Sequence, residues 1–153
     1  MKKTLVLGVG NLLLSDDGVG IHTIQRLQAA HGLSEEVQVV DGGTCGLDLL
    51  QFLEGIERLI IVDAAKMGKP FGTVVRLEGD QVPAHLSLKT SPHEIGLPEL
   101  LFAAKLTKIY PSEVVVFGVE PQSLETSLEM TPAVAARVDE LVELVTAEVM
   151  KGE

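Results

Sequence analysis

The sequence predicts an α/β fold, in which a mostly parallel five-stranded sheet is covered by helices on both faces. Apolar runs of strand length alternate with stretches whose apolar residues recur at helical spacing. The strand-like runs are almost continuously apolar, as is typical of parallel strands buried on both faces. A length of 153 residues is enough for a full core. We therefore expect residues 1–153 to form a single domain.

Five apolar runs rich in valine, isoleucine and leucine predict the strands. They are Thr4–Val9, Val37–Val40, Leu59–Val62, Thr73–Leu77 and Val114–Val119. The link between the third and fourth runs contains Gly68 and Pro70 and is too short for a crossover helix. We therefore expect the fourth strand to be antiparallel and the rest of the sheet to be parallel.

Four helices are expected between and after these strands. The first ends before Gly32, and the second, around residues 47–53, ends at Gly55. The third begins with Ser91-Pro92-His93-Glu94, a capping box with proline at the first helical position, and continues through residue 104. The last follows the polar cap and proline at residues 131–132 and reaches the end of the chain.

The charge balance excludes several classes of partner. A net charge of −10 and a pI near 4.8 would repel nucleic acid or an anionic membrane, whereas a cation or a basic polypeptide would be attracted. The N-terminal apolar run is too short for a signal sequence or a membrane span, so we expect a cytoplasmic protein. Cys45 is the only cysteine, so it can form no intrachain disulfide, and we interpret it as a buried thiol.

Functional residues are expected at the carboxyl ends of the strands, where ligands of such sheets bind. After the first strand, Gly8-Val9-Gly10 begins like a dinucleotide fingerprint, but Leu13 replaces the third glycine. Asp16 and Asp17 would repel a pyrophosphate, so we expect no nucleotide and interpret the glycines as a tight turn. The two aspartates fit helix capping, or one caps while the other faces the crevice.

The segment after the second strand allows two interpretations. The glycines of Asp41-Gly42-Gly43-Thr44 predict a flexible binding loop. A plain turn, in which Asp41 or Thr44 caps the next helix, explains the same residues equally well.

Asp63 directly follows the third strand, so its carboxylate leaves the sheet at the same edge. A charged group in this position needs a partner. It predicts a functional acid, although a turn cap or an ion pair with Lys66 or Lys69 would also explain it.

His93 lies in the first turn of the third predicted helix, where the helix dipole keeps the imidazole neutral and able to act as a base or metal ligand. His22, His31 and His85 have no such setting, and we interpret them as surface or packing residues. Two carboxylates and one imidazole therefore predict a metal site. The expected ligands are Asp17, Asp63 and His93. This ligand set suits nickel or zinc and leaves positions open for a substrate or water.

Several motifs together resemble one known family. They are Leu5-Val6-Leu7-Gly8-Val9-Gly10-Asn11, Asp16-Asp17-Gly18-Val19-Gly20, Asp41-Gly42-Gly43-Thr44, Asp63-Ala64, Ser91-Pro92-His93, Gly118-Val119-Glu120-Pro121, Ser123-Leu124 and residues 128–132. Their order and spacing resemble those of the hydrogenase maturation endopeptidases, and they extend over almost the whole chain.

The resemblance implies a three-layer α/β/α sandwich of the phosphorylase/hydrolase-like kind. It also implies an endopeptidase that removes the C-terminal tail of a nickel-iron hydrogenase large-subunit precursor after nickel insertion. The family's nickel ligands correspond to Asp17, Asp63 and His93, and the segment Asp41 to Thr44 is expected to engage the substrate. The first ligand is often glutamate in the family, so the roles of Asp16 and Asp17 stay open.

We hypothesise that nickel already seated in the precursor binds these residues, so that a nickel-free precursor docks poorly. Two routes to hydrolysis stay open, namely polarisation of water or the carbonyl by the metal, and general-base catalysis by Asp41 or by an Asp63 not bound to metal. The sequence contains no evident Ser-His-Asp constellation. The alternative is a nickel carrier or assembly chaperone without proteolytic activity.

Overall fold

The computed structural model describes residues 3–30, 32–44, 46–82 and 97–151. Its five strands are β1 (Thr4–Val9), β2 (Val37–Gly43), β3 (Arg58–Ala64), β4 (Val74–Glu78) and β5 (Glu113–Val119). They form one sheet in the order β2-β1-β3-β5-β4, and β4 is antiparallel to β5 while the other neighbouring pairs are parallel. The predicted mixed sheet is therefore confirmed.

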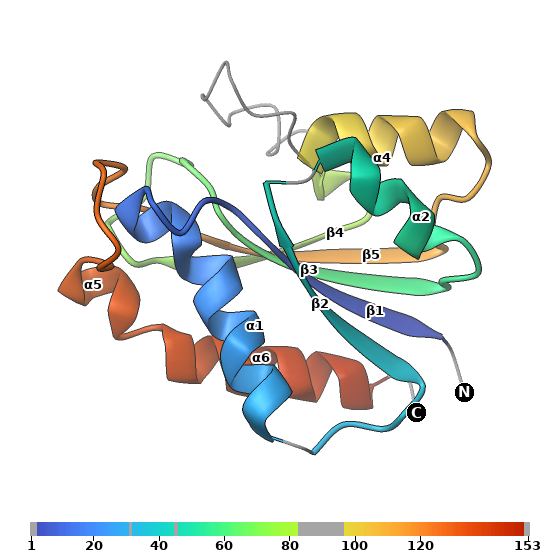
Figure 1. The fold of residues 1–153 in the computed structure, drawn as a ribbon, viewed down its shortest axis with the longest axis horizontal. Coiled ribbons are helices and arrows are strands. Elements are labelled where there is room, and N and C mark those ends of the chain that lie inside the picture. Colours follow the sequence, from blue (N-terminus) through green and yellow to red (C-terminus); the bar gives the residue numbers. More distant parts are fainter. Residues whose placement is uncertain (1–2, 31, 45, 83–96, 152–153) are drawn as a thin grey trace.

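Helices cover both faces of this sheet, so the predicted three layers are also confirmed (Figure 1). One face carries α1 (Val19–Ala30), which follows the short 3₁₀ helix η1 (Ser15–Gly18), and α6 (Val138–Met150). The other face carries α2 (Leu50–Leu53), which follows the 3₁₀ helix η2 (Gly46–Leu49), and α4 (Leu97–Leu106). The short α5 (Pro132–Ala135) leads into α6.

The central strands are apolar at every position because successive side chains enter two different cores. Leu5 and Leu7 of β1 pack with the residues of α2 and α4, whereas Val6 packs with those of α1 and α6. All six residues of β1 and all seven of β3 are buried. A period-2 strand that is covered on both faces needs apolar residues on both sides, which explains the near-continuous runs in the sequence.

Two predicted elements differ in extent from the structure, and a third boundary is untested. The strand expected at 37–40 continues to Gly43, so most of the expected binding loop is paired backbone. The expected last helix is two helices, because an i→i−3 bond from Arg137 to Val134 interrupts the α-helical pattern between α5 and α6. The expected start of the third helix, including Ser91 to Glu94, lies outside the described residues.

Gly20 lets the first turn of α1 lie directly against the ends of two strands. A Cβ atom at this position would come within 2.2 Å of the Val62 carbonyl oxygen and 2.8 Å of the Val9 carbonyl oxygen. Any larger residue would therefore push α1 away from the carboxyl ends of β1 and β3. This close approach is what brings the η1–α1 segment to the third strand.

A buried ionic cluster joins α6 to the opposite edge of the sheet. Glu148 is 2% exposed, and its carboxylate accepts bonds from Arg58 and from Arg76, whose Nε lies 2.6 Å from Oε1. Arg58, at the start of β3, is 3% exposed and also lies 2.9 Å from Glu113. The hydrogen bond from Arg76 is the main cause that lowers the pKa of Glu148.

Among the helices that the structure describes, none has an apolar stretch of the length needed to span a bilayer.

We expect the substitution Glu148→Gln to lower the free energy of unfolding by about 3 kcal/mol, because it leaves the buried Arg58 without its main counter-charge. The measurement is urea unfolding followed by far-UV circular dichroism, since the chain has no tryptophan. Because the pKa of Glu148 is lowered in the fold, its contribution is present above the unfolded pKa and is lost as the pH falls below about 4.

The matched control is Glu140→Gln on the same helix, since Glu140 forms an exposed ion pair with Arg137 at 3.2 Å. We expect it to change stability by about 0.5 kcal/mol or less. Equal effects of the two substitutions would contradict a stabilising role for the buried cluster.

Candidate functional site

The predicted acids lie at the point where the strand order reverses. The chain passes from β1 to β2 on one side and returns to β3 on the other side of β1. Asp17 belongs to η1, which follows β1, and Asp63 belongs to the end of β3. η1 and β3 contact each other, so the fold brings these two segments together. In open α/β sheets this crevice is where ligands bind.

Asp63 is the sixth residue of β3 and is 1% exposed. Its backbone pairs with Gly118 of β5. The prediction placed Asp63 just after the strand, but the strand continues through Ala64, so a charged side chain lies within the sheet itself. Burying a carboxylate is costly unless other groups compensate its charge, and such acids often mark functional sites.

Asp17 is 5% exposed and sits at the side of the crevice formed by β1 and η1. Its Oδ2 accepts a hydrogen bond from the Asn11 backbone N–H at 2.8 Å. Gly10, with φ of +135°, allows the tight turn, because a Cβ there would come within 2.0 Å of the Asp17 carbonyl oxygen. Among the described residues no hydrogen bond to Oδ1 is found, so part of this carboxylate is available to a ligand.

Asp16 has a different role, since its carboxylate is wholly engaged inside the protein. Oδ2 accepts hydrogen bonds from Gln122 N–H (2.9 Å), Ser123 N–H (3.0 Å) and the Thr131 hydroxyl (2.8 Å). Oδ1 accepts a fourth from Thr131 N–H at 2.7 Å. Asp16 is fully buried. Its bonds attach η1 to the β5–α5 connection (residues 120–131), so the hydrogen bonding favours Asp17 over Asp16 as a ligand.

Neither aspartate is the N-cap of η1, although both lie in its first turn, as the interpretation of helix capping and dipole also allowed. The residue at the N-cap position of η1 is Leu14, and no side chain makes the capping bond there. Thr131, expected to cap the last helix, does hold the N-cap position of α5, but it makes no capping bond, and its hydroxyl donates to Asp16. The Thr131 hydroxyl thus donates to a buried carboxylate and accepts no N–H bond from the helix end, and hydrogen bonds to charged groups are the stronger ones.

A second buried carboxylate fixes the neighbouring loop. Glu120, 6% exposed, accepts hydrogen bonds at Oε1 from Met67 N–H (2.7 Å) and Lys69 N–H (3.0 Å). The loop after β3 is thus tied to the end of β5. Sequence reasoning did not assign this role, although Glu120 belongs to a motif of the family resemblance. An acid directly after an apolar strand was the available signal.

Asp41 lies on the same edge of the sheet, at the end of β2, and is exposed. It pairs with Gly8 of β1, and its Oδ1 accepts a hydrogen bond from Gly43 N–H at 3.0 Å. Gly42 is buried between leucine side chains, whereas Thr44 is exposed. The structure therefore places Asp41 at the site's edge, and its predicted role in substrate binding stays a prediction.

The third predicted ligand, His93, lies outside the described residues, as do Cys45, His31 and His85. Within residues 3–30, 32–44, 46–82 and 97–151, no group of three histidine, cysteine, aspartate or glutamate side chains has a geometry that could hold a metal. The structure thus brings the segments of Asp17 and Asp63 together, and the complete three-ligand site stays a prediction.

The model of the hydrogenase maturation protease family matches residues 21–148. The chain belongs to this family. Hydrogenase 2 maturation protease from Escherichia coli K12 is 39% identical over 147 residues, which cover 95% of the chain and 89% of that protein. The hydrogenase expression/formation protein HupD of Rhodobacter capsulatus is also 39% identical, over 90% of the chain and 67% of its own length.

Solved structures of this protease family share the fold. The hydrogenase maturating endopeptidase HybD from E. coli superimposes with a TM-score of 0.92 at 36% identity, covering 98% of the chain and 93% of its own. The [NiFe] hydrogenase maturation protease HybD from Thermococcus kodakarensis gives 0.79 at 25% identity, with coverages of 96% and 99%. As a maturation protease the chain is a hydrolase of peptide bonds.

In this maturation protease, we expect Asp16→Asn to lower the free energy of unfolding by about 2–3 kcal/mol, because an amide offers one acceptor oxygen to the four donors and turns its own N–H groups toward them. Backbone amide exchange at Gln122, Ser123 and Thr131 should accelerate at the same time. The neighbouring Asp17→Asn should change stability by about 1 kcal/mol or less, since one hydrogen bond is affected.

Hydrogen exchange followed by mass spectrometry measures both variants. Equal protection of residues 120–131 in Asp16→Asn and in the wild-type protein would show that the carboxylate does not hold this connection.

Proposed function

We propose that this protease removes the C-terminal tail of a nickel-iron hydrogenase large-subunit precursor after nickel insertion, and that Asp17, Asp63 and His93 recognise the nickel. One observation carries the proposal. Two nearly buried aspartates lie on contacting segments at the switch point of the sheet, while the adjacent Asp16 is consumed by structural hydrogen bonds. The names of related proteins, which include a [NiFe] hydrogenase maturation protease, support the substrate class.

Electrostatics explains why such a site would respond to a cation. Two nearly buried carboxylates lie on contacting segments, and a divalent ion bound there would offset both negative charges. The net charge of −10 adds a long-range attraction for the cation. In this proposal nickel arrives as part of the precursor, so it belongs to the substrate and is not a resident cofactor of the protease.

Nickel recognition would position the scissile segment against the remaining groups of the site. The metal would supply charge stabilisation, and either Asp41, which is exposed at the adjacent strand end, or an Asp63 not bound to metal would accept a proton from an attacking water. Only a precursor that already holds nickel would therefore dock well. In this proposal docking takes place in the cytoplasm. A nickel-free precursor would lack the divalent charge that these two acids are proposed to recognise, and it would bind weakly.

The first test of this function compares nickel-loaded with nickel-free precursor. We expect tail removal from the loaded precursor and a rate at least about 100-fold lower for the unloaded one, which corresponds to losing about 2.7 kcal/mol of binding. Intact-mass measurement of the large subunit follows the reaction. Equal cleavage of both forms would contradict nickel gating, and transfer of nickel without tail loss would instead indicate a carrier.

We expect Asp17→Asn and Asp63→Asn each to lower kcat/KM for the loaded precursor by at least about 100-fold. Losing a metal ligand should lower activity more than losing a residue that only hydrogen-bonds to a ligand. The control is Asp48→Asn, an exposed aspartate in η2, which should leave cleavage unchanged. Circular dichroism checks that each variant is folded. Full activity in Asp17→Asn would exclude Asp17 from nickel recognition.

A further inference from the structure

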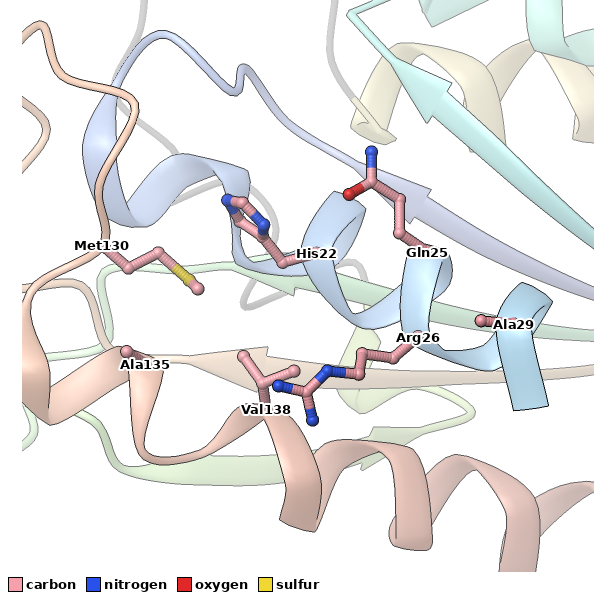
Figure 2. A pocket seen from close by; sticks show the side chains of 7 residues that line it. All are labelled: His22, Gln25, Arg26, Ala29, Met130, Ala135 and Val138. Carbon is pink, nitrogen blue, oxygen red and sulfur yellow. The ribbon is translucent and has the colours of Figure 1, made fainter.

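A groove lies between α1 and the start of α6, and neither Asp17 nor Asp63 lines it. Its volume is about 380 Å³, within the range of sites that hold a small molecule or a large apolar side chain. His22 and Arg26 of α1 line one side, and Met130, Ala135 and Val138 line the other. Figure 2 shows the side chains of His22 and Met130 extending toward each other across the groove, and that of Arg26 extending toward Val138.

His22 gives this groove an unused polar group. Its Nε2 atom is buried and has no hydrogen-bond partner within the described part of the chain. A buried polar atom without a partner costs free energy, and such an atom in a native protein needs an explanation. Burial also lowers the pKa of His22, so the ring is neutral at pH 7 and Nε2 can take part in a single, uncharged hydrogen bond.

The groove is continuous with the loops that hold the candidate site. Met130 precedes Thr131, whose N–H and hydroxyl both bind Asp16. The same connection pairs with the segment before η1, since Ser127 N–H donates to the Leu13 carbonyl at 2.9 Å. Leu13 and Leu128, which are 58% and 68% exposed, lie on these paired segments. Two exposed leucines on hydrogen-bonded backbone therefore lie on the segments that connect the candidate site with Met130 of the groove.

The remaining polar groups around the groove limit what it can bind. Arg26 already forms an ion pair with Asp139, so it offers no free positive charge to an anionic ligand. Apart from Gln25, the other walls are methionine, alanine and valine, and a methionine side chain adapts readily to an incoming apolar group. The groove is thus suited to a peptide segment with an apolar side chain that displaces Met130. A backbone group of the same segment would form a hydrogen bond with His22.

We propose that this groove docks an apolar side chain from an extended segment of the large-subunit precursor, with a backbone N–H or C=O of that segment bonded to His22 Nε2. The inference rests on the proposed function and names a second contact outside the cleavage site. Such a contact would raise affinity equally in the ground state and the transition state. Its loss should therefore change KM and leave kcat nearly constant.

The test uses the full-length protease with nickel-loaded precursor. Ala135→Trp fills the groove, and Ala136→Trp places the same side chain at the next exposed position, which does not line it. We expect Ala135→Trp to raise KM about tenfold or more, with kcat within about twofold, while Ala136→Trp matches the wild type. His22→Phe, which keeps the ring, should raise KM roughly 2- to 10-fold through the lost hydrogen bond.

Calorimetric titration of the same precursor separates this proposal from the proposed function. Should the wild type bind the precursor without cleaving it, proteolysis of this substrate is refuted, while a weaker affinity in Ala135→Trp alone still supports the groove. Unchanged KM and affinity in Ala135→Trp, equal weakening in Ala136→Trp, or an absence of binding by the wild type would each overturn the docking contact.

Discussion

The carboxylate of Asp16 is the interaction on which the candidate site depends. It lies at the start of η1 and accepts four hydrogen bonds from three residues that are more than 100 positions away in the sequence. Hydrogen bonds to a charged acceptor are worth about 1.5–3 kcal/mol each when buried. One side chain thereby fixes the β5–α5 connection against the loop that carries Asp17, and it leaves Asp17 as the acid of this pair that can serve a ligand.

The two edges of the sheet divide stability from function. At the carboxyl edge, Asp16 and Glu120 hold loops in place through backbone N–H groups, and the close approach at Gly20 brings η1 to β3. At the opposite edge, Glu148 joins α6 to β3 and β4 through two arginines. The charges of Asp16, Glu120 and Glu148 are therefore structural, whereas Asp17 and Asp63 lie on contacting segments at the switch point of the sheet.

The sequence was sufficient for the sheet, because apolar runs between turns determine the strands and a short link determines the antiparallel one. It was also sufficient to place Asp17 and Asp63 at one edge, since both follow from strand ends. It could not separate Asp16 from Asp17, because the donors that occupy Asp16 come from residues 122–131 and are brought near by tertiary folding alone. For the same reason the sequence alone predicts a cap at Thr131. It also predicts that β2 ends before Asp41, because it does not show that strand pairing overrides the preference of glycine for turns.

The central claim is that this fold presents Asp17 and Asp63 to a nickel ion held by another protein. X-ray absorption at the nickel edge of a precursor, recorded alone and in complex with the protease, tests it most directly. We expect additional oxygen or nitrogen ligands at nickel in the complex. We also expect the oxygen contribution to the spectrum to fall when the complex contains Asp17→Asn. A nickel spectrum that is the same with and without bound protease would contradict it.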